Sequence, residues 1–156
     1  LVTPPDAVRV TTDILENLIS RMGVSATINL KHANDDDVGG PVFDMDGEDS
    51  GLLIGRRGET LRSLQFLVTS IASHQSGDRV NLFLDVGGYQ ERRYSSLTNM
   101  AKRIADRVSS SGQAVTMEPM PPNERRVVHM TLSDYPGVST KSTGYGDQRQ
   151  IVVTPN

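Results

Sequence analysis

The sequence predicts an α+β protein built from two small domains, and three observations support this fold class. Apolar residues recur at helical spacing in some segments and alternate with polar residues in others, which indicates both helices and strands. The apolar segments are short and are separated by turns rich in glycine and aspartate. The pair Gly87-Gly88 interrupts the pattern near mid-chain, so we expect one domain at 1–87 and a second at 88–156.

In the first domain we expect the order helix, strand, strand, helix, helix, strand. Pro4-Pro5-Asp6 is typical of a helix start, and Gly23 is typical of a helix end. Residues 34–40 (NDDDVGG) predict a turn between the first two strands. The expected elements are a helix up to Met22, strands at 24–30 and around 43–45, helices at 48–54 and 59–74, and a strand at 80–86.

In the second domain we expect helices packed against a three-stranded sheet. Leu97, Met100, Ile104 and Val108 recur at helical spacing, and Gly112 can end that helix. The turn GYGD separates the last two apolar stretches. The expected elements are helices at 89–111 and from Pro121-Pro122 to Leu132, and strands at 113–118, 138–143 and 149–154.

The composition excludes several classes of function. The chain has no cysteine, so disulfides, thiolate zinc sites and cysteine nucleophiles are ruled out. No apolar run approaches the ~20 residues that span a bilayer, so we expect no membrane-spanning segment. The net charge of −3 is unevenly distributed, because residues 1–53 carry ten acids and three bases, whereas residues 54–156 carry nine acids and thirteen bases. Such an asymmetry can steer an anion to one face.

The sign of the charge changes at residues 54–58 (IGRRG), which place two glycines and two arginines between helix-forming segments. Glycine adopts backbone angles that other residues avoid, and it lets another backbone approach closely. Gly58 would precede the N-terminus of the 59–74 helix, where free N–H groups and the helix dipole favour an anion. Arg56 and Arg57 add charge and donors suited to phosphate. We therefore expect this loop to clamp a phosphodiester backbone.

The stretch IGRRGETL, within the expected order of elements, resembles a KH domain of type II. The Gly-x-x-Gly loop of KH domains holds about four nucleotides of single-stranded RNA or DNA. The resemblance implies a nucleic-acid contact at Ile54, Gly55, Arg56, Arg57 and Gly58, with Arg62 as a secondary candidate.

A second motif lies in NERRVVHMTL, where Arg125 and His129 are four residues apart and so share one face of a helix. The spacing resembles the motif of R-3-H domains, which bind single-stranded nucleic acid and are named for an arginine and a histidine separated by three residues. The arginine can hold a phosphate, and the histidine can donate a hydrogen bond or stack on a base. If a protonated His129 contacts phosphate, affinity should rise as the pH falls toward ~6. The secondary candidates for phosphate contact are Arg92, Arg93 and Arg126.

The whole chain resembles the C-terminal part of the bacterial Jag family, which joins a type II KH domain to an R-3-H domain. The stretches that carry the resemblance are GEDSGLLIGRRGETLRSLQFLV (47–68), LDVGGYQERRYSSL (84–97), EPMPPNERRVVHMTL (118–132) and DYPGVSTKSTG (134–144). The resemblance implies a cytoplasmic RNA-binding protein linked to the control of cell elongation and division. It also implies a preceding N-terminal region that could bind protein partners, and a chain that starts at Leu1 rather than Met agrees with a fragment.

Other motifs do not support metal, cofactor or catalytic chemistry. A calcium loop counted from Asp44 would need glycine sixth and glutamate twelfth, and the sequence has Asp49 and Gly55 there. A nucleotide-hydrolase phosphate loop needs a lysine after its second glycine, and Gly58 is followed by Glu59. No acid–base pair or nucleophile stands out. We therefore expect no metal, no cofactor and no enzymatic activity.

The expected function is thus non-catalytic binding of single-stranded RNA. Two alternatives stay open. Single-stranded DNA is one, because both domain types accept DNA and the sequence shows no contact to the ribose 2′-hydroxyl. A protein-interaction module is the other, motivated by the acidic N-terminal half and the net charge of −3. The salt dependence distinguishes nucleic-acid binding from a protein interface, because phosphate binding weakens as salt rises.

Overall fold

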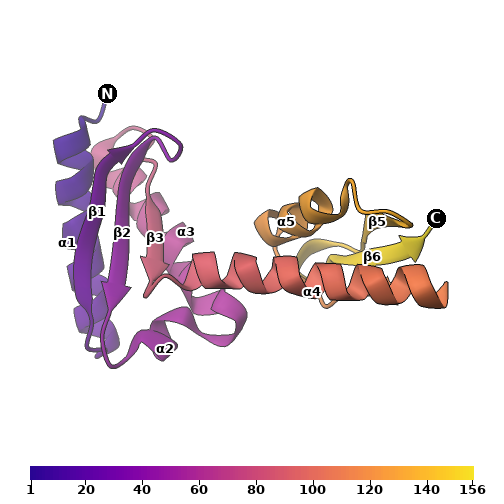
Figure 1. The fold of residues 1–156 in the computed structure, drawn as a ribbon. Coiled ribbons are helices and arrows are strands. Elements are labelled where there is room, and N and C mark those ends of the chain that lie inside the picture. Colours follow the sequence, from indigo (N-terminus) through magenta and orange to yellow (C-terminus); the bar gives the residue numbers. More distant parts are fainter. The chain divides into compact units, whose positions relative to one another are not determined.

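A computed structural model describes residues 1–156, which divide into two compact units, Leu1–Gln90 (unit 1) and Glu91–Asn156 (unit 2). Each unit contains one three-stranded sheet together with helices (Figure 1). The predicted α+β fold class is confirmed.

Unit 1 has the predicted order of elements. Its first helix begins where the Thr3 hydroxyl accepts a hydrogen bond from the Asp6 N–H, and it ends at Gly23, which adopts the left-handed conformation. The elements are α1 (Pro4–Met22), β1 (Thr27–Asp35), β2 (Gly40–Asp46), α2 (Ser50–Ile54), α3 (Glu59–Ser76) and β3 (Phe83–Val86).

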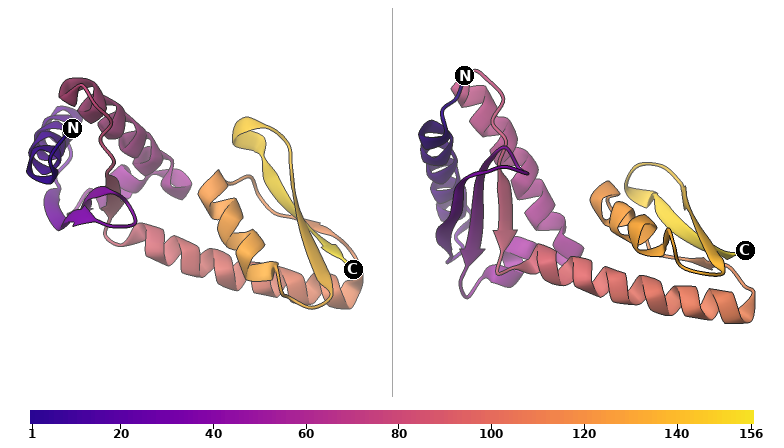
Figure 2. Two further views of the ribbon diagram at one scale, coloured as in Figure 1. Left: turned by 90° about the horizontal axis from the view of Figure 1, so that it is seen from above. Right: turned by 45° about the horizontal axis from the view of Figure 1, so that its top comes forward.

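The sheet of unit 1 has the strand order β1-β2-β3, with β1 antiparallel and β3 parallel to β2. Helices α1 and α3 pack against each other and cover the same face of the sheet (Figure 2). Phe43 and Met45 of β2 pair with Leu84 and Val86 of β3, and all four side chains are buried. The core therefore lies between β2, β3 and the two long helices.

The first strand differs from the prediction of a strand at 24–30, because β1 spans Thr27–Asp35. Irregular register in its second half marks β-bulges, which let the strand continue after the apolar alternation has ended. The predicted turn is correspondingly shorter. The Asp35 carboxylate closes it by accepting hydrogen bonds from the N–H groups of Asp37 and Val38.

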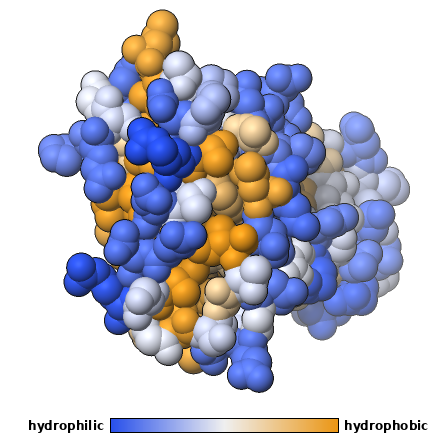
Figure 3. Space-filling model, turned by 90° about the vertical axis from the view of Figure 1, so that its left-hand side faces the viewer, coloured by the Kyte–Doolittle hydropathy of each residue, from blue (hydrophilic) through white to orange (hydrophobic).

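As an edge strand, β1 is largely exposed. Leu30 pairs in register with the buried Phe43, yet 45% of its surface remains accessible. Figure 3 views the molecule from the side of α1, where apolar residues reach the surface among polar ones.

Unit 2 is built around α4 (Tyr89–Ser111), a helix that begins in unit 1. The other elements are β4 (Val115–Thr116), α5 (Pro122–Leu132), β5 (Val138–Thr143) and β6 (Gln150–Pro155). The sheet order is β4-β6-β5, and both pairs are antiparallel. Buried residues of α4, α5 and the sheet form the core: Leu97, Ala101, Ala105, Val108, Val128, Leu132, Ile151 and Val153.

The strand predicted at 113–118 is reduced to Val115–Thr116. Two further backbone bonds continue toward β6, from Met117 N–H to the Ile151 carbonyl and from Met120 N–H to the Arg149 carbonyl. Pro119 lies between them and has no N–H to donate, so a regular ladder cannot extend through it.

Candidate nucleic-acid interface

The Gly-Arg-Arg-Gly loop joins α2 to α3, as predicted, and it contains a short 3₁₀ turn at Arg56–Gly58. Its backbone has positive φ at Gly55 (70°), Arg57 (56°) and Gly58 (76°), and Arg57 is the only non-glycine residue of the chain with positive φ. This tight bend leaves the side chains of Arg56 and Arg57 exposed. The loop therefore presents two guanidinium groups from a constrained backbone.

Both glycines of the loop lie where a side chain has no room. A Cβ on Gly55 would collide with the Thr60 side chain, and a Cβ on Gly58 would lie 2.8 Å from Cε1 of Tyr89. Gly58 is buried beneath that ring. The glycine requirement at residue 58 thus has two causes, a left-handed backbone and an aromatic ring in contact with the Cα.

Alanine at residue 58 is therefore expected to lower the free energy of unfolding of unit 1. Gly77 offers a matched control, because its φ of 68° is similar while a Cβ there meets open space. The backbone strain of about 1–2 kcal/mol should be common to both variants. The collision with Tyr89 should add about 1–2 kcal/mol in Gly58→Ala alone. Urea unfolding measures the difference. Equal decreases in the free energy of unfolding of the two variants would show that the Tyr89 ring moves aside without destabilising unit 1.

The structure gives Arg62 and Ile54 supporting roles in this loop. Arg62 is a predicted secondary phosphate contact, but its Nη1 donates a hydrogen bond of 2.7 Å to the carbonyl of Arg57. That bond holds the strained part of the loop from the first turn of α3. Ile54 is half-buried and packs against the core of unit 1, so it anchors the end of α2.

Tyr89 is a residue of this site that sequence reasoning missed. Three hydrogen bonds hold the backbone around it. Gly87 N–H donates to the Met45 carbonyl, Gly88 N–H donates to the Asp44 carboxylate, and Gln90 N–H donates to the Asp85 carboxylate. The Asp85 carboxylate thereby caps the first turn of α4. No motif signals this arrangement, because Tyr89 is 31 positions from the glycine that it covers.

In unit 2 the side chain of His129 lies over β5. Its Nδ1 is 2.7 Å from Thr140 Oγ1, and its Nε2 is 2.9 Å from Ser142 Oγ. Thr140 and Ser142 are two residues apart and point to the same face of the strand. The imidazole is therefore fixed by two hydroxyls, which can each donate or accept a hydrogen bond.

Arg125 and Arg149 lie beside this histidine. The Arg125 guanidinium donates to the Met120 carbonyl at 2.6 Å, and the Met120 N–H donates to the Arg149 carbonyl. Sequence reasoning missed Arg149 because it is twenty residues away from His129 in the sequence. The hairpin of β5 and β6 brings it to α5. We call Arg125, His129 and Arg149 the cationic patch.

The environment lowers the pKa of the His129 imidazole below its ordinary value of 6.5. Burial is the first cause, and the positive charges of Arg125 and Arg149 add to it. The neutral form of the ring therefore predominates at pH 7. The rise in affinity expected toward pH ~6 requires a protonated ring, and the lowered pKa moves that protonation to more acidic pH. His129 acts at neutral pH as a hydrogen-bonding group.

Removing the charge of Arg149 is expected to raise the pKa of His129 toward 6.5. The Arg149→Gln variant loses one of the two nearby positive charges that disfavour the imidazolium ion. An NMR titration of the ring protons measures the shift. Lys141→Gln is the matched control, because Lys141 lies between Thr140 and Ser142 and points to the opposite face of β5. An Arg149→Gln titration curve that superimposes on the Lys141→Gln curve would contradict the electrostatic cause.

The structure changes the role of Arg93, a predicted secondary phosphate contact. Arg93 forms a two-bond ion pair with Glu124, with Nε–Oε1 and Nη2–Oε2 distances of 3.0 and 3.2 Å. The Arg93 side chain is 21% exposed and that of Glu124 only 4%. This pair joins α4 to α5 and is structural. Arg92 and Arg126 are exposed, on α4 and α5 respectively.

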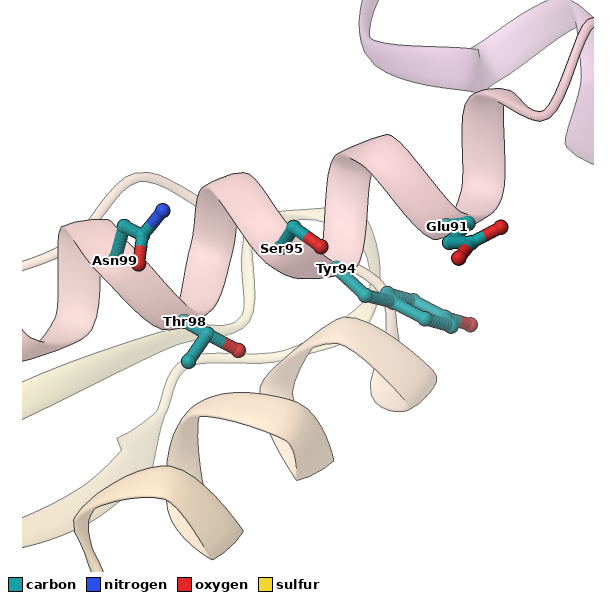
Figure 4. A pocket seen from close by; sticks show the side chains of 5 residues that line it. All are labelled: Glu91, Tyr94, Ser95, Thr98 and Asn99. Atoms are coloured by element: carbon teal, nitrogen blue, oxygen red, sulfur yellow. The ribbon is translucent and has the colours of Figure 1, made fainter.

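A shallow pocket lies on α4 of unit 2, lined by Glu91, Tyr94, Ser95, Thr98 and Asn99 (Figure 4). The Tyr94 hydroxyl accepts a hydrogen bond of 2.8 Å from the Asn123 side chain of α5. The lining contains one carboxylate and no cation. This pocket is therefore unsuited to phosphate, in contrast to the loop of unit 1 and the cationic patch.

No group of three or more histidine, aspartate and glutamate side chains is placed to hold a metal ion. No helix combines the length and the apolar character that a bilayer crossing requires.

Comparisons with known proteins match both units. The family description "KhpA/KhpB, KH domain" fits residues 9–84, and that of the R-3-H domain fits residues 95–155. The chain is 35% identical over 142 residues to the RNA-binding protein KhpB of Clostridium symbiosum, which covers 91% of this chain and 63% of that protein. It is 34% identical over 147 residues to the RNA-binding protein KhpB of Lactiplantibacillus plantarum, covering 94% of this chain and 44% of that protein.

The protein of the same name from Bacillus subtilis is 34% identical over 114 residues, 72% of this chain and 55% of that protein. The chain thus spans between 44% and 63% of the length of these curated relatives. The two domain matches confirm the domain pair predicted from the two motifs. The chain therefore belongs to the Jag family, in which a KH domain of the KhpA/KhpB type is followed by an R-3-H domain.

Proposed function

We propose that this chain binds single-stranded RNA without catalysis, with the Gly-Arg-Arg-Gly loop as its primary phosphate clamp. The observation that carries the proposal is the loop itself, in which Arg56 and Arg57 are exposed on a backbone bent through three positive φ angles. The RNA-binding names of the relatives support the choice of ligand.

The start of α3 strengthens the clamp. Gly58 is the residue before this 18-residue helix, and no side chain caps its N-terminus. The Glu59 N–H donates to the Arg56 carbonyl, and no side chain competes for the N–H groups that follow it. The helix dipole favours negative charge there. A phosphate above the loop can thus interact with backbone donors and with the guanidinium groups of Arg56 and Arg57.

The cationic patch of unit 2 supplies a second contact. Arg125 and Arg149 attract phosphate, and the neutral His129 stays fixed between the two hydroxyls of β5. Two contacts on one chain add avidity when one strand reaches both. A single strand long enough to reach both contacts is therefore favoured over a shorter one.

Fluorescence anisotropy with a labelled single-stranded RNA tests the proposal across a range of salt concentrations. If the two loop arginines and the two patch arginines each neutralise one phosphate, the slope of log K against log salt should be about −3. A DNA strand of the same sequence runs in parallel and reports on the 2′-hydroxyl. Absence of binding, or binding that salt leaves unchanged, would overturn the proposal in favour of a protein partner. Tighter binding to DNA would replace RNA by DNA as the ligand.

The Jag-family resemblance extends this proposal to the cell. It implies a cytoplasmic protein whose RNA binding serves the control of elongation and division. The longer relatives leave room for additional segments that bind protein partners.

A further inference from the structure

We propose that Tyr145 is a base-stacking residue that works together with the cationic patch. This inference rests on the proposed function and assigns one nucleobase of the bound strand to one side chain. The chain has four tyrosines and no tryptophan. Three of the tyrosines make contacts within the fold. The Tyr89 ring packs on Gly58, the Tyr94 hydroxyl accepts a hydrogen bond from Asn123, and the Tyr135 hydroxyl donates one to Asp106. Tyr145 is the exception, because 91% of its surface is exposed.

The backbone that carries Tyr145 is well fixed although the ring is exposed. Tyr145 follows β5 and precedes a 3₁₀ turn at Gly146–Gln148, and its carbonyl accepts a hydrogen bond of 3.1 Å from Gln148 N–H. On its other side, the Gly144 carbonyl accepts a bond of 2.7 Å from Arg149 Nη1. A ring on such a fixed turn loses little backbone entropy when a ligand covers it.

The same turn adjoins the cationic patch. Arg149 belongs to the patch and holds Gly144, the residue before Tyr145. Ser142, which contacts His129, lies three residues before Tyr145, with a bend at Gly144 (φ 88°) between them, so the two residues are at most about 10 Å apart. The exposed ring is therefore within reach of a nucleotide whose phosphate lies at Arg149.

The chemistry around Tyr145 favours a base over other occupants. Single-strand binding sites combine cationic groups that follow the backbone with aromatic rings on which bases stack. The turn itself is polar and exposed, and Asp147 carries a carboxylate that disfavours a second phosphate there. The turn offers no neighbouring apolar side chain that would extend the ring into a surface for a protein partner.

The test places a single tryptophan at residue 145 of the full chain. Because the chain has no tryptophan, the Tyr145→Trp variant reports on this position alone. Phe66→Trp, at an exposed position of α3 in unit 1, is the matched control. Each variant is titrated with a mixed-sequence single-stranded RNA and with an abasic strand of the same length, and anisotropy of labelled strands measures binding separately.

In the Tyr145→Trp variant we expect saturable quenching of the indole fluorescence by the RNA and weak quenching by the abasic strand. The fluorescence of Phe66→Trp should change little with either strand. Affinity for RNA should fall about tenfold in Tyr145→Ala and stay near the wild-type value in Tyr145→Phe. Binding of RNA without quenching in Tyr145→Trp, or equal quenching in the two tryptophan variants, would overturn the stacking role and leave RNA binding intact. Absence of RNA binding by the wild type would instead overturn the proposed function and this inference with it.

Discussion

The Arg56→Asp/Arg57→Asp variant is expected to bind single-stranded RNA about 100-fold more weakly than the wild type. Each guanidinium–phosphate contact contributes about 1.5 kcal/mol, so the loss of two corresponds to about two orders of magnitude in affinity. The two new carboxylates would in addition repel phosphate at the start of α3. Both side chains are exposed, so the fold should persist. Anisotropy measures the affinity, and circular dichroism checks that the helices remain.

A second double variant controls for the change in net charge. Lys102 and Arg103 are adjacent exposed bases on α4, and Lys102→Asp/Arg103→Asp makes the same change of four charges. If the loop acts as a specific clamp, this control should retain most of the affinity. Equal losses in the two variants would attribute binding to the overall field of the protein and would remove the loop from the mechanism.

The Arg93→Ala variant is expected to lower the free energy of unfolding of unit 2 by about 3 kcal/mol. The substitution leaves the Glu124 carboxylate buried, with 4% of its side chain exposed and both hydrogen bonds from Arg93 lost. An uncompensated buried charge of this kind is among the most destabilising changes in a folded protein. Urea unfolding followed by circular dichroism measures the loss. The unfolding transition of unit 2 should shift to lower urea concentration, while that of unit 1 should stay unchanged.

Two further variants separate the pair from its surroundings. Arg103→Ala removes an exposed arginine from the same helix and should change stability little. Arg93→Met with Glu124→Leu replaces the pair by apolar side chains of similar volume and should recover most of the loss. If Arg93→Ala unfolds at the same urea concentration as Arg103→Ala, the ion pair does not stabilise α5 against α4.

The order of elements could be predicted from the sequence because it depends on local signals. Hydrophobic period distinguishes helix from strand, and Gly23, Gly77 and Gly112 end helices in the left-handed conformation. The bounds of β1 and β4 could not be predicted, because they depend on which partner strand lies alongside. Bulges extend β1 beyond its apolar alternation, and Pro119 limits β4 from outside the strand.

The site, like the fold, could be predicted where local signals determine it. Arg56 and Arg57 were found because a loop motif places them, and the pair Arg125 and His129 was found because helical spacing places it. The partners of these residues are distant in the sequence. The ring over Gly58, the hydroxyls around His129 and the arginine of the hairpin come together only through tertiary packing. For the same reason, the spacing alone could not show that Arg93 is committed to Glu124.

The helix that begins at Tyr89 has a practical consequence for dividing the chain. A cut between residues 87 and 88, the boundary predicted from the glycine pair, would leave the first fragment without Tyr89. Gly58 would then face water, and the capping carboxylate of Asp85 would have no helix to cap. A cut after Gln90 keeps these contacts but exposes a helix end that unit 2 also needs, since α4 runs across the boundary. Fragments of the two halves should therefore overlap in sequence, and each should carry its own copy of the first turns of α4.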